Sequence, residues 1–438
     1  MGNNQSDLIP GLLFFLVLLG LGLWMISQTR THIQTRSFQL KLFLIAMLVR
    51  FLAALAIYEF GLSNVIGDED SSGYFLGRYY GGLWIGQNRS FLELPSLWAP
   101  AFEEHHRGYY YLVGTLFFLT GWTGRIPPAA LNCFFGAMTV VFTYRISRSL
   151  FSNWTSVRVG WLVCFIPSMI IWSCQTLKEP VVIFMETVAL YSCIRLRQAG
   201  FDLKYILLCI AAMFLLYPFR FYASLVTGLA IFVTFLLPEL GKRAGSARFA
   251  GLAIVILVVP LAISSGLAAR SESQIEQFDI DRIQQFRVDI ARGQGSGVES
   301  NFDMKTPAGF TLATAIGALH LLLAPFPWQL GGSLRMVFTF PEMLLWWWLF
   351  FAGLLPGLWY AIRNRLFEVM PALVFIFILG LLYSMTFGNV GLVFRQRAQI
   401  LPWLLIFTVL GFEIRKLKKL NNFGFRSYRP GVTLTPRH

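Results

Sequence analysis

Three acidic residues stand together early in the chain, in a sequence with few acids elsewhere. Asp68, Glu69 and Asp70 lie in "NVIGDEDSSGYFLGRYY", among only 22 Asp and Glu residues in the 438-residue chain. A carboxylate can accept the proton of a hydroxyl or amine group as that group attacks a substrate. Burial and neighbouring acids both raise the pKa of a carboxyl group toward the range in which it acts as a base. The plainer alternative is a solvated loop that the acids keep soluble.

Cations occur in several separate segments that could bind an anionic group. An arginine fork matches phosphate oxygens in geometry, and a lysine supplies a compact positive charge. These cations, together with the acid Glu179 beside Lys178, are the predicted substrate contacts. They are His105, His106, Arg107, Lys178, Glu179, Arg220, Arg395 and Arg397. The alternative for the last three arginines is a side chain that only reaches to the membrane surface. Arg50 falls inside an apolar run, where a structural partner such as Glu186 is expected.

The composition of the chain is typical of a helical membrane protein. The chain is 56% hydrophobic and 13% charged, whereas soluble domains carry roughly 25% charged residues. A membrane β-barrel would show segments of about ten alternating residues instead. We therefore predict an all-α, polytopic helical membrane protein. Its net charge of +14 indicates basic cytoplasmic loops that contact anionic membrane lipids. Nucleic acid is not expected as a partner, because no separate basic domain is present.

About eleven apolar runs approach the ~20 residues that span a bilayer. They are residues 8–27, 42–63, 127–145, 159–174, 180–194, 205–219, 222–238, 249–266, 342–360, 368–386 and 398–413. We expect the first run to be a retained span, because "MGNNQSD" before it lacks the basic residues of a secretory signal. Two further segments, 108–121 and 309–326, are short or interrupted.

The positions of Lys and Arg predict the orientation. If residues 108–121 and 309–326 lie in the interface without crossing, all the basic loops face the cytoplasm. These are the loops after residue 27 and at 145–158, 195–204, 242–248 and 363–365. If both segments crossed, three basic loops would face outward, against the positive-inside rule. We therefore predict an N-terminus outside and a C-terminus in the cytoplasm, which fits a bacterial inner membrane.

This topology gives one integral membrane domain over residues 1–438. It leaves two large exoplasmic loops at 64–126 and 267–341 and a basic cytoplasmic tail at 414–438. Irregular backbone at membrane depth is tolerated only against protein or a watery cavity. We therefore expect both loops to carry interfacial helices and to roof an outward-facing cavity.

The second loop contains an amphipathic pattern. Ile275, Phe278, Ile283 and Phe286 recur at roughly helical spacing, which predicts a helix lying on the membrane. "GQGSG" is expected to end that helix.

The early exoplasmic loop, opening with an acid motif shortly after a span, resembles the GT-C superfamily of membrane glycosyltransferases. That family includes protein O-mannosyltransferases and the aminoarabinose transferases that modify lipid A. Its first loop carries an Asp, often followed by Glu, with an aromatic residue four positions after the Asp. Asp70 stands four residues before Tyr74 and is the better match, whereas Asp68 and Glu69 reproduce the acid pair. Both aspartates stay candidates for the base.

Later segments extend the resemblance over most of the chain. "RGYYYLVGTLFFLTG", "LNCFFGAMTVVFTYRISRSLF" and "PSMIIWSCQTLKEPVVIFMETVALY" are similar to spans that follow the first loop in bacterial members. "LAPFPW" and "GNVGLVFRQRAQILP" resemble segments of relatives associated with polysaccharide genes.

The resemblance implies a glycosyltransferase that uses a polyprenyl-phosphate-linked sugar donor. Cations would hold the donor phosphate, Tyr74 would contact the substrate, and one of the three acids would activate the acceptor for an inverting displacement. The implied acceptor is a glycan, a lipid or a protein at the outer face of the membrane.

No metal is expected to be obligatory. Mg²⁺ or Mn²⁺, bound by acids of the first loop with Glu103 and Glu104, is the alternative. The five cysteines lie in or beside apolar runs and form no Cys/His ligand set.

Three other functions fit the same residues. A polymerase of lipid-linked repeat units would need two anionic lipid sites, which scattered cations could supply. A lipid-linked saccharide transporter is disfavoured because no internal repeat is visible. For a non-enzymatic assembly partner, the acid triplet would be dispensable.

Overall fold

The described part of the chain is built from α-helices. The computed structural model describes residues 8–29, 31–62, 72–103, 107–236, 279–292, 296–298, 302–332 and 334–422. Over these residues no β-strand forms, and the only β contact is an isolated antiparallel bridge between Gly297 and Asn389. The all-α prediction is confirmed for these ranges.

The chain divides into two compact units. Unit 1 contains residues 1–145, 160–187 and 213–224, and unit 2 contains residues 146–159, 188–212 and 225–438. The predicted single membrane domain stays a prediction.

Unit 1 contains the early helices of the chain. They are α1 (Leu8–Ser27), α2 (Ile33–Glu59), α4 (Ser72–Gly86), the 3-10 helix η2 (Phe91–Glu93), α5 (Leu94–Glu103), α6 (Gly108–Thr120) and α9 (Pro167–Ser173). Five helices contribute residues to both units: α7 (Ile126–Leu150), α8 (Asn153–Phe165), α10 (Glu179–Ala199), α11 (Leu203–Phe219) and α12 (Phe221–Leu236).

Unit 2 contains the late helices. They are α15 (Ile280–Arg292), α16 (Pro307–Leu323), η4 (Pro327–Gly332), α17 (Leu334–Leu349), the π-helix η5 (Phe350–Leu354), α18 (Leu355–Met385) and α19 (Val390–Asn422). Helix α18 packs along α19 and α16. Phe375 and Trp403 contribute a ring contact to the α18–α19 interface, with centroids 5.9 Å apart.

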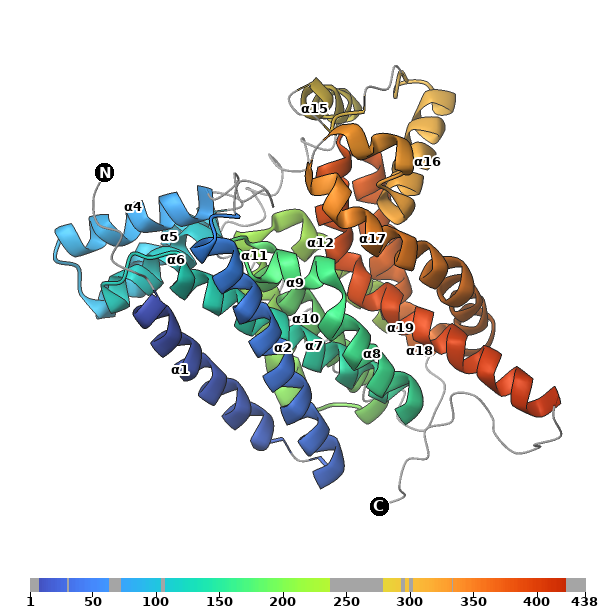
Figure 1. The fold of residues 1–438 in the computed structure, drawn as a ribbon, viewed down its shortest axis with the longest axis horizontal. Helices are drawn as coiled ribbons and strands as arrows, with labels where there is room; N and C mark the ends of the chain where they lie inside the picture. Colours follow the sequence, from blue (N-terminus) through green and yellow to red (C-terminus); the bar gives the residue numbers. More distant parts are fainter. Residues whose placement is uncertain are drawn as a thin grey trace. The chain divides into compact units, whose positions relative to one another are not determined.

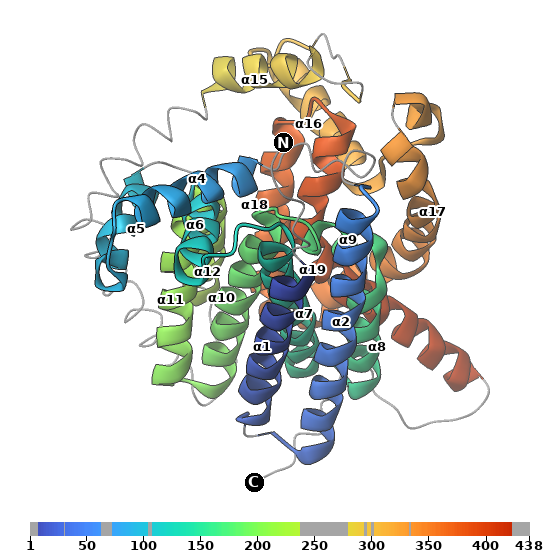
Figure 2. The ribbon, with the colours of Figure 1, turned by 60° about the vertical axis from the view of Figure 1, so that its left-hand side comes forward.

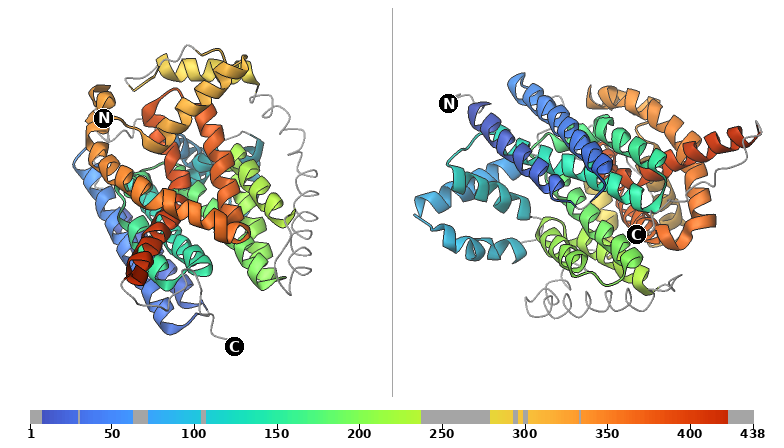
Figure 3. Two further views of the ribbon diagram at one scale, coloured as in Figure 1. Left: turned by 90° about the vertical axis from the view of Figure 1, so that its right-hand side faces the viewer. Right: turned by 90° about the horizontal axis from the view of Figure 1, so that it is seen from below.

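Helices α1 and α2 run side by side in every view (Figures 1, 2 and 3). Phe15 stacks on Phe51 with ring centroids 4.1 Å apart. Most remaining side chains of α1 are apolar and exposed, including Leu16, Val17 and Trp24. Exposed apolar helix surface of this kind is stable in lipid, not in water.

Each predicted span that the structure describes overlaps a helix, but residues 159–174 are divided between α8 and α9, and residues 342–360 and 368–386 fall in one helical segment. Among the residues that the structure describes, four helical segments are long and apolar enough to cross a membrane: Leu8–Ser27, Ile33–Glu59, Ile126–Leu150 and Thr339–Met385. Helices α8 and α9, bent by 56°, make a fifth if they form one span. The chain is thus an integral membrane protein of helical type. The total of eleven spans and the orientation stay predictions, and residues 249–266 lie outside the described ranges.

The break between α8 and α9 explains the buried Arg50. Pro167 begins α9 and has no N–H group, so the carbonyl of Val163 lacks its usual helical donor. The guanidinium of Arg50 lies 3.4 Å from that oxygen and 3.3 Å from the carbonyl of Cys164, and its Nε donates to Ser173 Oγ at 2.9 Å. The prediction that Glu186 is the partner of Arg50 was wrong. Backbone carbonyls at the helix break and the hydroxyl of Ser173, in the same unit, accept its hydrogen bonds instead.

The two doubtful apolar segments both form short helices. Helix α6 has 13 residues and α16 has 17, which corresponds to lengths of about 20 Å and 26 Å. Neither reaches upright across a hydrocarbon core of ~30 Å.

Glycines bring α4 against α6. A Cβ atom on Gly77 would lie 2.6 Å from Cβ of Val113, and one on Gly81 would lie 2.8 Å from the carbonyl oxygen of Gly114. Because residues four apart share one helix face, these glycines form a flat strip on α4. The helix that follows the acid motif is therefore packed tightly onto α6.

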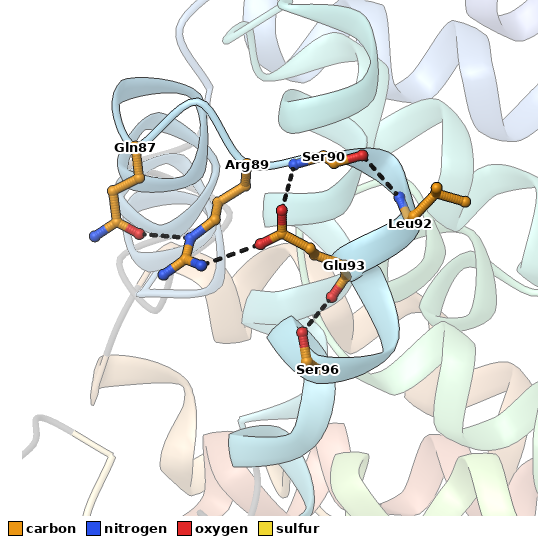
Figure 4. A network of polar contacts seen from close by, with 6 residues as sticks. All are labelled: Gln87, Arg89, Ser90, Leu92, Glu93 and Ser96. Atoms are coloured by element: carbon orange, nitrogen blue, oxygen red, sulfur yellow. Dashed lines mark hydrogen bonds and ion pairs between the residues drawn. The ribbon is translucent and has the colours of Figure 1, made fainter.

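A capping box holds the turn from α4 into α5 (Figure 4). The N–H of Ser90 donates to the Glu93 carboxylate at 3.1 Å, and the N–H of Leu92 donates to Ser90 Oγ at 3.3 Å. Arg89 pairs with Glu93 at 3.0 Å. The backbone N–H of Ser90 and then Arg89 lower the pKa of Glu93.

The amphipathic helix expected in the second loop is confirmed over Ile280–Arg292, and it ends directly before "GQGSG". Ile283 belongs to a buried cluster, and Arg287 Nη1 donates to the carbonyl of Met385 at 3.1 Å. One face of α15 therefore packs on its own unit. Ile275 and Phe278 lie outside the described residues.

Candidate functional site

The acid motif directly precedes α4 in the sequence. Asp68, Glu69 and Asp70 lie outside the described residues, as do His105 and His106. Their predicted roles stay predictions. The described surroundings begin at the first turn of α4.

Tyr74 anchors that first turn. The side chain is 6% exposed, and its hydroxyl donates to the carbonyl of Thr123 at 2.7 Å. Its ring makes an edge contact with Phe117 of α6, with centroids 5.9 Å apart. Tyr74 therefore fixes the position of the helix start that follows the acid motif.

Arg125 is a cation that the sequence analysis missed. Its guanidinium lies over the ring of Tyr74, 4.9 Å from the centroid, and 5.4 Å from the centroid of Phe75. The side chain is half-buried at the start of α7. Arginine directly before "IPP", at the end of a loop predicted to be exoplasmic, is the signal that could have identified it.

The start of α4 lies against the segment between α9 and α10. A Cβ atom on Gly73 would lie 2.6 Å from Tyr109 Cδ1 and 3.4 Å from the carbonyl oxygen of Thr176. The carbonyl of Thr176 belongs to the segment that leads into Lys178. Residues about 100 positions apart in sequence are thereby brought together in unit 1.

Polar side chains hold this segment in place. The amide nitrogen of Asn132 lies 2.5 Å from the carbonyl oxygen of Gln175 and 2.7 Å from that of Leu177. The N–H of Thr176 donates to the hydroxyl of Tyr58 at 3.1 Å. Asn132 was missed in the sequence because a buried amide in an apolar helix leaves no pattern that predicts its partners.

Glu179 and Arg220 form a buried ion pair. Nη2 of Arg220 lies 2.9 Å from Oε1 of Glu179, and the two residues are 6% and 2% exposed, respectively. Glu179 begins α10, and Arg220 lies between α11 and α12. Both were predicted to contact substrate. The charge of Arg220 is balanced by a carboxylate of the same unit, and substrate contact by either residue stays a prediction.

Lys178 and Arg107 flank this pair. Lys178 precedes Glu179 and is half-buried, whereas Arg107 is exposed at the start of α6. A Cβ atom on Gly108 would lie 2.9 Å from the carbonyl carbon of Pro218, so α6 begins beside the end of α11. The segments that carry Arg107, Lys178 and Arg220 are thereby joined through described contacts in unit 1.

Arg397, in unit 2, is buried among its own helices. It is 2% exposed, and its Nη1 donates to the carbonyl of Ala324 at 3.0 Å. Its guanidinium lies 4.6 Å from the ring centroid of Phe394 and 5.7 Å from that of Trp346. Arg397 thereby binds the carbonyl of the residue that follows α16, and phosphate binding by Arg397 stays a prediction. Arg395 is half-buried.

Within the described ranges, no group of three or more His, Cys, Asp or Glu side chains could hold a metal ion. The five cysteines are free and buried. Glu104 and the acid motif, which would bind Mg²⁺ or Mn²⁺ in the alternative, lie outside those ranges.

No family model matches the chain, and no curated protein is similar at a significant level. Among solved structures, the chain is similar to the archaeal oligosaccharyltransferase AglB from Archaeoglobus fulgidus, in complex with an inhibitory peptide and a dolichol-phosphate, with a TM-score of 0.48 and 12% identity over 92% of this chain and 53% of AglB. A second match is the Archaeoglobus fulgidus oligosaccharyltransferase in the apo form, with a TM-score of 0.46 and 14% identity over 89% of this chain and 52% of the other. The chain spans about half the length of both structures.

Proposed function

We propose that this protein is a membrane glycosyltransferase that moves a sugar from a polyprenyl-phosphate-linked donor to an acceptor at the outer face of the membrane. The observation that carries this proposal is the contact of the start of α4 with Tyr109 and Thr176. Through this contact, the helix that follows the acid motif packs against the segment that leads to Lys178 and the Glu179–Arg220 pair. Such an arrangement suits an acid that activates an acceptor beside an anionic donor.

Asp70 acts as the general base in this proposal. The acceptor oxygen attacks the anomeric carbon of the sugar, and the bond between that carbon and the donor phosphate oxygen breaks. The acceptor proton passes to the Asp70 carboxylate, and polyprenyl phosphate leaves with the electron pair. Attack on the side opposite the leaving group inverts the anomeric configuration.

Lys178 and Arg125 bind the donor phosphate. Both are half-buried cations in unit 1 next to segments that contact α4. The buried Glu179–Arg220 pair orients Lys178 by fixing the start of α10. The acceptor is a glycan, a lipid or a protein, and no divalent cation is required.

The test is turnover of a polyprenyl-phospho-sugar by the full-length protein in proteoliposomes. Asp70→Asn is expected to lower turnover at least ~100-fold, the usual contribution of a general base, with unchanged donor affinity. Arg125→Gln should weaken donor binding and spare the chemical step, and chelation with EDTA should leave turnover unchanged.

Asp68→Asn is the matched control, since it removes an acid from the same motif. Full turnover by Asp70→Asn with a loss in Asp68→Asn would move the base to Asp68. Full turnover by both variants, when both fold normally, would reject the base assignment. Movement of labelled lipid across the liposome without release of sugar would indicate a transporter.

A further inference from the structure

A cavity lies far along the sequence from the acid motif, between the first turns of α18 and the last turns of α19. Its volume is about 540 Å³. Its polar and aromatic lining consists of Trp359, Tyr360, Arg363, Asn364, Arg415 and Lys418. All belong to unit 2, and none was singled out as a site residue.

The cavity is cationic. Arg363, Arg415 and Lys418 are exposed and line it together. Three positive charges around one cavity repel each other, and an anion between them would relieve that repulsion.

Nearby acids in the described ranges are engaged elsewhere. Glu413 accepts hydrogen bonds from Ser152 Oγ and Thr155 Oγ1 at 2.5 Å each. Glu368 pairs with Arg365 at 2.7 Å. The tail that follows α19, residues 423–438, contains no acid in its sequence. Among the described residues, none of the three cations forms an ion pair with a carboxylate.

The same cavity has an apolar side. Pro356 and the buried Ile414 and Leu417 line it, and the indole of Trp359 is 68% exposed at its edge. Helix α18 is part of the apolar segment Thr339–Met385, and α19 changes here from apolar residues to "EIRKLKK". Tryptophan and basic side chains at such a transition are typical of the membrane interface.

We propose that this cavity binds the headgroup of an anionic phospholipid. The phosphodiester lies between Arg363, Arg415 and Lys418, and Asn364 and Tyr360 offer polar groups to the glycerol. The first part of each acyl chain packs on Trp359 and on the apolar wall. Basic pockets between membrane helices on the cytoplasmic side are suited to such headgroups, and the predicted topology places this end of α19 in the cytoplasm.

Lipid binding to the detergent-solubilised, full-length protein tests this inference, with retained lipid counted by native mass spectrometry. Phosphatidylglycerol is expected to be retained in preference to phosphatidylcholine. The double variant Arg415→Gln with Lys418→Gln should bind phosphatidylglycerol on the order of tenfold more weakly, because each cation near a lipid surface contributes attraction.

The matched control is Lys416→Gln with Lys419→Gln. It removes the same charge from the same turns of α19, at positions that do not line the cavity. Equal weakening in the two double variants, or equal retention of the two lipids by the wild type, would overturn the proposal.

Glycerol 3-phosphate separates the two sources of phosphate. It should compete weakly, because it lacks the acyl chains that contact Trp359. Competition equal to that of the lipid would assign the cavity to a soluble phosphate ester and reject the lipid. No arm uses a sugar donor, so a failure here is independent of glycosyl transfer.

Discussion

Arg50, Arg397 and Glu413 are buried ionisable side chains whose polar atoms are used inside the protein. Arg50 compensates a broken helix, Arg397 closes the end of α16, and Glu413 accepts hydrogen bonds from two hydroxyl groups. Burial of a charge is costly unless such partners are present. A buried cation in this chain is thus not in itself an indication of a phosphate site.

The Glu179–Arg220 pair yields a prediction at this scale. Glu179→Gln removes the negative charge from a pair with a 2.9 Å contact and leaves a buried guanidinium without it. Breaking one side of a buried pair costs about 3–5 kcal/mol. We expect a clearly lower melting temperature in detergent.

Glu93→Gln is the control, because Glu93 also pairs with an arginine but is exposed. It should melt close to the wild type. An unchanged melting temperature for Glu179→Gln, together with weaker donor binding, would show that Glu179 and Arg220 contact the substrate.

Helix α4 follows the acid motif in the sequence and packs closely on α6. Gly81→Ala would place a methyl group 2.8 Å from the carbonyl of Gly114, whereas Gly82 has open space around it. The backbone of Gly114 cannot move aside for the methyl group as a flexible side chain could. Gly81→Ala should therefore destabilise the protein by about 1–3 kcal/mol. Its turnover should fall as α4 shifts.

Gly82→Ala tests the same helix without the contact. It should be neutral or slightly stabilising, because alanine favours helix over glycine by up to ~1 kcal/mol. Equal effects of the two substitutions on stability would contradict the close packing of α4 on α6.

The capping box between α4 and α5 gives a pH prediction. Its contacts lower the pKa of Glu93 in the folded protein. The turn is therefore fully stabilised above the unfolded pKa of Glu, ~4.3, and loses that stability as the pH falls through the lower, folded value. Hydrogen exchange of the peptide over residues 87–96, corrected for intrinsic rates, should accelerate in that acid window.

Glu93→Gln should remove this pH dependence, because a glutamine side chain does not titrate. A pH response of equal size in the variant would assign the effect to another group.

The whole molecule is predicted to have its N-terminus outside and its C-terminus in the cytoplasm. A reporter inserted after Lys204, at the start of α11, should then be cytoplasmic, since Arg195 and Arg197 at the end of α10 add positive charge to the same turn. A reporter inserted after Gln87, in the turn after α4, should be exoplasmic. Both reporters on one side would require one crossing more or one fewer between them, and a cytoplasmic reporter at Gln87 would move the acid motif away from the outer face.

The sequence by itself determined the class of the protein and the positions of its most apolar helices. Apolar composition and run length are local properties, so α1 has the predicted bounds and the doubtful segments form short helices. The amphipathic spacing located α15 for the same reason. The acid motif was also visible in the sequence, because three adjacent acids are rare in an apolar chain.

Only the tertiary structure decided which cations are already neutralised. Arg220 and Glu179 are 41 residues apart. Arg125, just before α7, lies over the ring of Tyr74 in α4. These partners depend on which helices pack together, and that depends on close contacts such as glycine against backbone. Such complementarity is spread over distant residues, so no local pattern predicts it.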